Sequence, residues 1–530
     1  MTTMRAAAAA IALSLGLGMG LAGPSFAQAE KTLRIVPQAD LRVLDPVWTT
    51  AQVTQNHAYM VYDVLFAIDS KFEPRPQMVD TWTRSDDGMA WTFRLREGMR
   101  FHDGSPVRAA DAVASIRRWS ARSAPGGAMM QRAESLEALD DLSFRLVFKR
   151  KFGPVLEVLG TPSLPPFVMR ESDAATDPFK QVAEVVGSGP FVFSKAEHRP
   201  GTRVVYRRFA DYKPRPEPAD GYAGGKVAKV DRVDWINMPD ISTAAAALRA
   251  GEVDYVEYLP FDNIPEMERD KGVVVRILNG IGLLGHVRPN SLQPPFDDPR
   301  ARQALNLLVD QKVFLKALGA EGAYARECFA VFVCGGPFET DFATAPWARQ
   351  DKARARQLLA EAGYKGEPIV ILDPGDQPVI STIANVMAGL LREIGATVDL
   401  QTMDWSAKIT RRNSKDRAGP RSQGWHLAFT WWTGIAMSNP MTNVPLVTTC
   451  DGKNLYGWPC DEAIEKLRDE FIEASGKAEQ MKVIEKLQAR FYEVVPYVNT
   501  GLFFQPAAYS ARLRGVPATL TLVAWNIEKP

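Results

Sequence analysis

Two glycine-containing segments have a spacing that could serve phosphate chemistry. The run Gly280-Ile281-Gly282-Leu283-Leu284-Gly285 satisfies the dinucleotide-binding pattern and follows an apolar stretch at residues 273–278. A phosphate-binding loop must open a helix whose N-terminus faces the phosphate, yet Pro289 follows within four residues. Gly225-Lys226-Val227 lacks the Ser or Thr that would hold magnesium. We therefore expect no nucleotide and no other cofactor.

The histidines are the side chains that could support acid–base or metal chemistry. None is spaced for joint metal binding, so each is better explained as a satisfied structural or surface residue. Neither a nucleophile elbow nor a zinc-protease helix motif occurs. A hydrolase would need catalytic residues that lie far apart in the sequence and meet only in the fold. We expect no catalytic residues and no metal site. The histidines are His57, His102, His198, His286 and His426.

The four cysteines fall into two local pairs, Cys328 with Cys334 and Cys450 with Cys460. In an exported chain this spacing indicates two short-loop disulfides, each worth roughly 2 to 3 kcal/mol in the chain-entropy model. A zinc site is the weaker alternative. Neither pair has the gap of two to four residues of a metal knuckle, and no His cluster lies beside them in sequence.

The N-terminus indicates export. A run of small and apolar residues from Ala6 to Ala22 follows Arg5, and Ser25-Phe26-Ala27 has the form of a cleavage site. We expect a secretory signal peptide over residues 1–27, cut after Ala27. The alternative is an uncleaved anchor, but the run is rich in Ala and Gly and shorter than the ~20 residues of a span. No later stretch approaches that length, so we expect no membrane span in the mature chain.

The charge and the length of the chain limit its possible partners and its number of domains. The chain has 63 Lys plus Arg against 62 Asp plus Glu, a formal net charge of +1. Nucleic-acid binders normally show a basic excess, so we expect no nucleic-acid partner. A length of 530 residues predicts three or four compact units, and 46% hydrophobic residues supply sizeable cores.

The first half of the chain alternates strand and helix patterns. Asp86-Asp87-Gly88 marks a turn before an alternating strand at residues 91–95, and residues 97–101 predict a further hairpin. A helix capped by Ser242 and ended by Gly251 leads into a strand at residues 253–256.

The second half continues in the same manner. Asp298 and Pro299 predict one helix start, and Asp351 predicts another. Strands are expected at residues 369–372 and 397–400, with a helix between them. This alternation favours an α/β fold with two or more lobes over one large barrel.

Five collinear motifs carry a family resemblance. In their order and spacing the chain resembles the family 5 bacterial extracellular solute-binding proteins, the peptide, nickel and related binding components of ABC importers. The resemblance covers nearly the whole mature chain. The motifs are Trp82 to Val107, Gly187-Ser188-Gly189-Pro190-Phe191, Gly251-Glu252-Val253-Asp254, Arg300-Ala301-Arg302-Gln303-Ala304-Leu305 with Asp310, and Leu358 to Tyr364.

The resemblance implies a periplasmic binding protein-like α/β fold of type II, cluster C. Two lobes would close over a ligand by a hinge motion, and an inserted subdomain would decorate the first lobe. Mapped onto this chain, hinge strands are expected near Gly285 to Asn290 and near Gln505. The expected parts are lobe I at 28–65, 206–285 and 505–530, an inserted subdomain at 66–205, and lobe II at 286–504.

The function implied by the resemblance is periplasmic capture of a small solute, a peptide or peptide-like molecule, for an ABC importer. Permease and ATPase subunits would be the partners of a monomeric, non-catalytic receptor. A nickel or metal-chelate receptor of the same fold is the main alternative, and the scattered histidines give it little support. A secreted enzyme or chaperone-like protein on this scaffold is a second alternative.

The expected ligand site centres on Trp431-Trp432 and the following Asn439 and Asn443. Adjacent aromatic rings can form a rigid apolar wall, and amides can orient polar groups of a ligand. At strand period one Trp would pack into the core of lobe II while the other faces the ligand. Peptide-binding members carry an Asp hereabouts that pairs with the ligand α-amine, but residues 435–438 supply none.

A basic segment and two further tryptophans complete the candidates. The basic segment contains a single acidic residue, Asp416, among the basic residues Arg411, Arg412, Lys415, Arg417 and Arg421. A solvated loop is favoured over an anion anchor or a permease-docking surface. Among these we select Arg412 as a ligand-binding candidate. Trp405 and Trp48 are further candidates that could equally be core residues.

Overall fold

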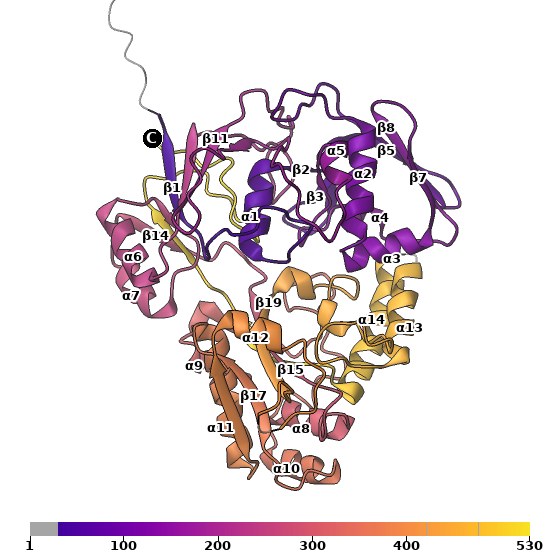
Figure 1. Ribbon diagram of the computed structural model, residues 1–530, viewed down its shortest axis with the longest axis vertical. Coiled ribbons are helices and arrows are strands. Elements are labelled where there is room, and N and C mark those ends of the chain that lie inside the picture. The colour runs from indigo at the N-terminus through magenta and orange to yellow at the C-terminus, as the bar shows by residue number, and fades with distance from the viewer. Residues whose placement is uncertain (1–29, 420, 475) are drawn as a thin grey trace, which may run out of the picture.

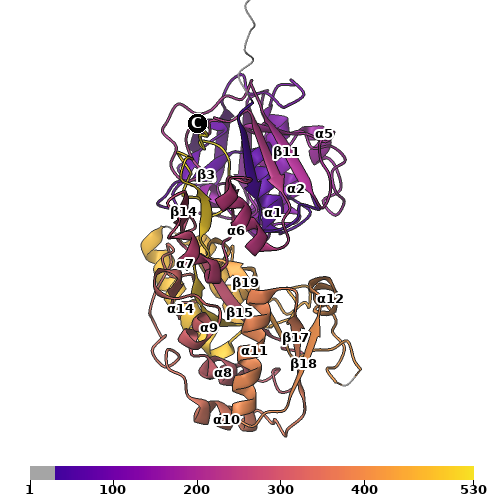
Figure 2. The ribbon, with the colours of Figure 1, turned by 90° about the vertical axis from the view of Figure 1, so that its left-hand side faces the viewer.

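The structure is a computed structural model that describes residues 30–419, 421–474 and 476–530. The expected signal peptide and its cleavage site after Ala27 lie outside the described residues. Figures 1 and 2 show two bodies stacked along the long axis, which we call the upper body and the lower body. No helix in the described part of the chain has both the length and the apolar character needed to cross a bilayer.

The upper body is built on a sheet of seven strands from the described residues. Strand β1 runs parallel to both β12 and β13, while β21 is antiparallel to its two neighbours. Helices α1 (Gln52–Val61), α6 (Ile241–Ala250) and α7 (Ile264–Met267) and the 3-10 turn η1 (Phe261–Asn263) belong to the same body. The strand order is β10 (Phe191–Phe193), β11 (Arg203–Arg208), β12 (Arg232–Ile236), β1 (Thr32–Val36), β13 (Tyr255–Val256), β21 (Ala507–Ser510) and β14 (Val273–Arg276).

A four-stranded antiparallel sheet lies beside it, with the strand order β5 (Val79–Arg84), β6 (Ala90–Leu95), β8 (Ser143–Phe148) and β7 (Ala133–Ala138). The predicted turn and alternating strand are confirmed, because Trp91, Phe93 and Leu95 are all buried on one face of β6. The hairpin predicted at residues 97–101 is wrong, since β6 pairs instead with β5 and β8. The smaller elements here are α2 (Ala109–Ser120), α3 (Ala124–Arg132), α4 (Val155–Leu159), α5 (Glu171–Ala174), β2 (Asp63–Val64) with β9 (Phe167–Val168), and β3 (Phe66–Ile68) with β4 (Pro74–Pro76).

The lower body contains a mixed sheet of six described strands. Strand β17 runs parallel to β18 and β19, whereas β15 is antiparallel to β19 and β20. The strand order is β16 (Ala325–Arg326), β20 (Val498–Phe503), β15 (Leu283–Pro289), β19 (Leu427–Thr433), β17 (Ile369–Pro374) and β18 (Val398–Met403). Its helices and 3-10 turns are α8 (Pro299–Leu308), α9 (Gln311–Ala317), η2 (Gly322–Tyr324), α10 (Lys352–Glu361), α11 (Pro378–Glu393), α12 (Trp405–Arg411), η3 (Gly434–Met437), η4 (Val444–Leu446), α13 (Glu462–Glu473) and α14 (Lys477–Val494).

Side-chain caps begin the predicted helices. The Asp298 carboxylate accepts a hydrogen bond from Arg300 N at 2.8 Å, and Asp351 accepts one from Arg354 N at 2.8 Å, as expected. The cap predicted at Ser242 is wrong, because Asp240 caps α6 by accepting from Thr243 N at 2.7 Å. A carboxylate two residues upstream is an equally good acceptor, and the helix therefore starts earlier.

Two short segments join the bodies. Residues 277–282 lead from β14 to β15, and residues 504–506, which include Gln505, lead from β20 to β21. The hinge strand expected at residues 285–290 lies in and just after β15, which is hydrogen-bonded to β19 and to β20 within the lower sheet. The glycine-rich run of the dinucleotide pattern thus opens a strand, and no helix follows it for a phosphate to face.

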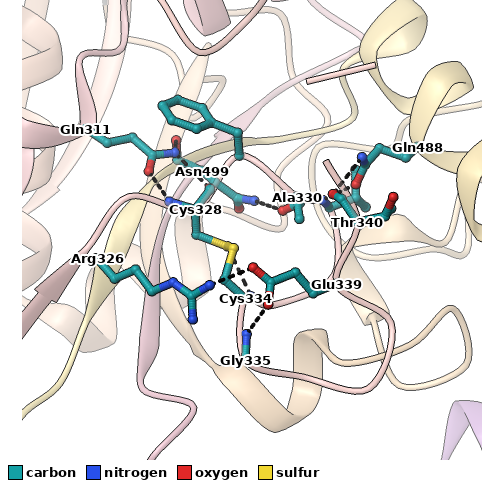
Figure 3. Close-up of a disulfide and its surroundings, with 12 residues drawn as sticks. Gln311, Arg326, Cys328, Ala330, Cys334, Gly335, Glu339, Thr340, Gln488 and Asn499 are labelled. Atoms are coloured by element: carbon teal, nitrogen blue, oxygen red, sulfur yellow. Dashed lines mark hydrogen bonds and ion pairs between the residues drawn. A yellow bond between two sulfur atoms is a disulfide. The ribbon is translucent and has the colours of Figure 1, made fainter. Parts of the chain in front are cut away.

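Both predicted disulfides are present, Cys328–Cys334 and Cys450–Cys460. Figure 3 shows the first one inside a hydrogen-bonded loop. The Gln311 side chain donates to Cys328 O at 2.9 Å and accepts from Cys328 N at 2.6 Å. The Glu339 carboxylate accepts from Gly335 N at 2.7 Å and pairs with Arg326 at 2.6 Å. These contacts hold the buried residues 331–333 against the lower body.

The four-stranded sheet also contacts the lower body, away from the two connecting segments. Figure 1 shows α3 directly above α13 and α14. The Arg132 guanidinium lies 2.7 Å from the Asp469 carboxylate and 3.9 Å from that of Glu473, and Arg150 lies 2.8 Å from Glu473. One hydrophobic cluster runs across this contact and includes Phe152 and Ile472. We call this contact the α3–α13 latch.

Candidate functional site

The two sheets present the carboxyl ends of their parallel strands to the region between the bodies. In Figure 1, β1 runs downward and the loop after it lies at the lower edge of the upper body. Strands β17, β18 and β19 are parallel, and α12, which follows β18, lies on the side of the lower body that faces upward in both views. Ligands of open α/β sheets bind outside such carboxyl ends. This region is therefore the candidate site.

On the upper body, Glu257 follows β13 and meets residues that follow β1. The Glu257 carboxylate accepts a 2.8 Å hydrogen bond from Gln38 N and a 2.7 Å hydrogen bond from the Asn56 amide. Burial raises the pKa of Glu257 to about 7, although both hydrogen bonds act to lower it. Sequence spacing did not reveal Glu257, because its partners lie about 200 residues away in the chain.

A pocket lies between this carboxylate and the connecting segments. Both connecting segments contribute to its wall, which places the pocket at the junction of the two bodies. The cavity has a volume of about 20 Å³, room for a single water molecule, and its lining mixes acidic, hydroxyl and amide side chains with apolar ones. The lining residues are Tyr255, Glu257, Tyr258, Leu278, Asn279, Gln505, Ala507, Thr519, Leu520, Thr521 and Leu522.

On the lower body, the loop after β19 is fixed to a connecting segment. The Gly434 N–H donates to Gly282 O at 2.8 Å. A Cβ atom at Gly434 would lie 2.0 Å from Ile281 O, so only glycine permits this approach. The start of η3 is therefore held beside residues 281–282.

Trp431 and Trp432 point to opposite faces of β19, as strand period requires. The Trp431 ring packs with the hydrophobic clusters on the α11 side of the sheet, and Trp432 packs with the cluster that contains Leu284. Both rings are half-buried, so their burial does not distinguish a ring in the core of the lower body from a ring that faces the ligand, which was the expectation. Trp432 Nε1 is buried and has no hydrogen-bond partner among the described residues.

The two asparagines after η3 have different surroundings. Asn439 is half-buried, and its side-chain oxygen accepts from Met441 N at 2.9 Å and Thr442 N at 3.1 Å. Asn443 is fully buried, its amide nitrogen donates to Tyr497 Oη at 2.7 Å, and its oxygen accepts from Leu446 N. Both polar atoms of Asn443 are thus used within the fold.

Trp405 and Arg412 lie at the two ends of α12. The Lys408 ammonium is 4.4 Å from the centroid of the Trp405 ring, and the Arg412 guanidinium is 4.3 Å from that of Tyr456. Lys408 is fully buried and donates to Phe429 O at 2.7 Å. Burial, reinforced by the nearby Arg412, holds the pKa of Lys408 well below its usual range. Trp405, Lys408 and Arg412 have helical spacing, a signal that could have identified Lys408 from the sequence.

Trp48 lies on the upper body in the segment between β1 and α1. It is 37% exposed, and its Nε1 donates to Phe179 O at 3.3 Å. Its own carbonyl oxygen accepts from Arg122 at 3.0 Å. The structure therefore separates this predicted residue, on the upper body, from the lower-body candidates.

Other basic residues near Arg412 stabilise the loop that follows α12. Arg411 donates to Gln401 Oε1 at 2.5 Å, and Lys415 donates to Gly452 O at 2.9 Å. The side chains of Arg417 and Arg421 are exposed. Only Arg412 of this basic segment both stacks on an aromatic ring and keeps a buried, unpartnered Nε.

The histidines have different surroundings, except that His57 and His198 both pack against Phe193. His57 contacts Tyr206 Oη, His102 contacts Gly189 O, and His426 bridges Val370 N and Pro294 O. His286 is fully buried on β15, and burial followed by the nearby Arg288 and Lys408 lowers its pKa well below the usual value. Across the described ranges, His, Cys, Asp and Glu form no group of three that could hold a metal ion.

Comparison with solved structures gives a close fold match over nearly the whole chain. The periplasmic binding protein AgaA of Agrobacterium tumefaciens in complex with agropinic acid covers 94% of this chain and 99% of its own, with a TM-score of 0.78 and 20% identity. The ABC transporter-associated protein DppA of Helicobacter pylori in complex with the peptide STSA covers 94% and 98%, with a TM-score of 0.77 and 20% identity. The fold is therefore that of the periplasmic binding proteins.

Sequence comparison agrees with the fold. A probable peptide ABC transporter periplasmic-binding protein of Sinorhizobium fredii is 39% identical over 506 residues, which are 94% of each chain. The sequence model of the bacterial extracellular solute-binding proteins, family 5 Middle, matches residues 73–454. This chain belongs to the family 5 bacterial extracellular solute-binding proteins.

Proposed function

We propose that this protein is the periplasmic substrate-binding component of an ABC importer and captures a peptide or peptide-like solute between its two bodies. The observation that carries the proposal is that both sheets turn the carboxyl ends of parallel strands to one region. In the described part of the chain, two short segments connect the two bodies beside this region. The similarity to a relative named as a peptide-binding importer component supports a peptide as the solute.

We assign lobe I to the upper sheet and lobe II to the lower sheet. The lobes meet at residues 277–282 and 504–506, which act as the hinge. The four-stranded sheet belongs to an inserted subdomain that ends before β10, since β10 and β11 pair with each other and with β12. Closure brings the inserted subdomain onto lobe II through the α3–α13 latch.

Solute contacts come from both lobes. The half-buried Trp432 of lobe II supplies an apolar wall with an unpartnered N–H, and Asn439 lies on the following loop. The pocket around Glu257 and Asn279 contributes polar groups from lobe I and the hinge. Trp48 is the exposed candidate on lobe I, and Asn443 lies in the core of lobe II.

The receptor acts without chemistry, as a monomer that a signal peptide directs to the periplasm and that delivers its solute to permease and ATPase subunits. A family composed of substrate-binding proteins supports a non-catalytic role. Peptides are favoured over a nickel chelate because no group of three His, Cys, Asp or Glu side chains within the described residues could hold a metal ion.

The test is thermal unfolding of the purified mature protein with an equimolar library of di- to pentapeptides and, in parallel, a nickel–histidine chelate. A ligand that binds only the folded state adds RT ln(1 + [L]/Kd), about 2.7 kcal/mol at 100 Kd. We expect peptides to raise the unfolding temperature and to be recovered unaltered by mass spectrometry. If only the chelate stabilised the protein, a peptide would be excluded as the solute. If a stabilising peptide were chemically altered, the non-catalytic receptor function would be excluded.

A further inference from the structure

We propose that the Cys450–Cys460 disulfide is a thiol-exchange site, and that its reduction by a dithiol opens residues 451–459 while Cys328–Cys334 stays oxidised. We call residues 450–460 the cross-linked loop, and we call Cys328–Cys334 the buried disulfide. The inference goes beyond the proposed function and does not depend on the solute, because it concerns a covalent bond of the chain itself.

The two disulfides differ in accessibility. Both cysteines of the cross-linked loop are exposed. The cysteines of the buried disulfide, Cys328 and Cys334, are 1% and 5% exposed and belong to a large hydrophobic cluster. Exchange requires a thiolate to approach one of the two sulfur atoms, so access decides which bond reacts. The buried disulfide therefore serves as a control within the same molecule.

The cross-linked loop lies between two elements and is irregular itself. In the described chain, no residue from 447 to 461 belongs to a helix or strand, since η4 ends at Leu446 and α13 begins at Glu462. A hydrogen bond of 2.9 Å from the exposed Lys415 to Gly452 O ties the tip of the loop to the lower body. A backbone without ladder hydrogen bonds opens more easily once a cross-link is removed.

One residue of the cross-linked loop is held in an unfavourable backbone conformation. Trp458 has a φ of 40°, in the left-handed region that bulky side chains rarely adopt. Its ring is buried, with its centroid 6.3 Å from that of the Trp425 ring. Such a conformation persists only where the surroundings fix it, and the cross-link at Cys460 lies two residues away. Reduction therefore removes one of the constraints that keep Trp458 in place.

The base of the cross-linked loop is held independently of the disulfide. Asp461 N donates to Thr448 O at 2.9 Å, and Thr448 Oγ1 donates to Asp461 O at 2.9 Å. The Asp461 carboxylate also caps α13 and pairs with Arg490 at 2.5 Å. Reduction therefore frees the residues between the two cysteines, while α13 and the lower sheet remain folded.

The reaction needs a dithiol as its co-reactant. The thiolate of the dithiol forms a bond to Sγ of one cysteine, the Cys450–Cys460 bond breaks, and its electron pair leaves with the other Sγ as a thiolate. The second thiol of the dithiol then attacks the mixed disulfide and releases the remaining cysteine. The chain gains two electrons and two protons, and the dithiol becomes a disulfide. A small dithiol and a dithiol protein share this chemistry.

The experiment exposes the folded wild-type protein to dithiothreitol and, separately, to reduced thioredoxin, and blocks free thiols with N-ethylmaleimide at set times. Mass spectrometry of the digested protein follows both disulfides in one sample. We expect Cys450–Cys460 to be reduced at least about tenfold faster than Cys328–Cys334. The reagent with the larger rate constant identifies the source of the dithiol. Equal rates, faster loss of the buried disulfide, or no reduction by either reagent would overturn the exchange site.

Limited trypsin digestion tests the opening of the cross-linked loop. Lys453 is an exposed cleavage position inside the loop, and a protease needs several residues around such a position to unfold locally. We expect trypsin to cut after Lys453 about tenfold faster in the reduced protein than in the oxidised protein, as measured by peptide mapping. Cleavage at Lys453 that does not change on reduction would overturn the opening.

Two double variants provide a second measurement of the opening. Cys450→Ser with Cys460→Ser should be cut after Lys453 at the rate of the reduced wild type. Cys328→Ser with Cys334→Ser is the matched control and should be cut there at the rate of the oxidised wild type. Circular dichroism checks folding, and the reduced wild type decides if either variant unfolds. Cleavage of the folded first variant at the oxidised rate would also overturn the opening.

Discussion

The Asn443 side-chain amide donates a 2.7 Å hydrogen bond to the hydroxyl of Tyr497, in the interior of lobe II. Tyr497 in turn stacks at 4.7 Å on the ring of His286 on β15. Asn443 is therefore linked to strand β15 through the ring of Tyr497.

Replacing Asn443 with Ala should destabilise the fold by about 1–3 kcal/mol, because it leaves the buried Tyr497 hydroxyl and Leu446 N–H without this partner. Urea unfolding measures the loss. Tyr497→Phe is the matched variant, since it removes only the first of these two hydrogen bonds and should cost less. An Asn443→Ala protein of wild-type stability with abolished solute binding would instead make Asn443 a direct ligand contact.

Trp432→Ala should weaken peptide binding while the protein stays folded, because a half-buried ring of the proposed solute wall is removed. We expect at least a tenfold rise in Kd by calorimetry. Trp82, 38% exposed on β5 in the four-stranded sheet, provides the control, and Trp82→Ala should bind as the wild type does. Unchanged affinity in Trp432→Ala would remove this ring from the site.

Glu257 should make stability depend on pH. Its folded pKa of about 7 exceeds the ordinary value of 4.5, so between these values the folded chain keeps a proton that the unfolded chain has released. The free energy of unfolding therefore falls as pH rises through this window, by up to about 3 kcal/mol at 1.36 kcal/mol per pKa unit. Solute-free Glu257→Gln should lack this part of the slope in urea titrations at pH 4.5 to 7.5. Parallel slopes for the two proteins would contradict the raised pKa.

Breaking the α3–α13 latch should speed solute release. The double variant Asp469→Asn with Glu473→Gln leaves the buried Arg132 without a carboxylate, which disfavours the closed arrangement. We expect a faster dissociation rate in stopped-flow measurements, with a smaller change in association. Glu462→Gln, at the exposed start of α13, is the control. Unaltered release in the double variant would show that the latch is not part of closure.

Loss of the disulfides should lower stability without altering solute selectivity. The chain-entropy relation gives about 2 kcal/mol for Cys328–Cys334 and about 3 kcal/mol for Cys450–Cys460, because the second loop is longer. Paired Cys→Ser variants, unfolded thermally with and without reductant, measure each bond. If reductant still lowered the unfolding temperature after both cysteine pairs were replaced, that loss of stability would not come from the two disulfides.

Local spacing within the sequence determined much of this protein. The Asp298 and Asp351 caps, the alternating strand at residues 91–95 and both cysteine pairs were predictable, because each depends on neighbours within about ten positions. The five collinear motifs likewise identified the family, since a conserved order of local turns and caps marks a fold.

Only the tertiary structure decided which residues share the site. His286 and Lys408 lie more than a hundred positions apart and meet through the pairing of β15 with β19 and the packing of α12 beside it. We place the proposed hinge at residues 277–282 because β15 is paired on both sides, which no local pattern encodes. Burial of Asn443 and the pairing of Glu257 with Gln38 and Asn56 depend on contacts between distant segments, and local sequence patterns do not specify such contacts.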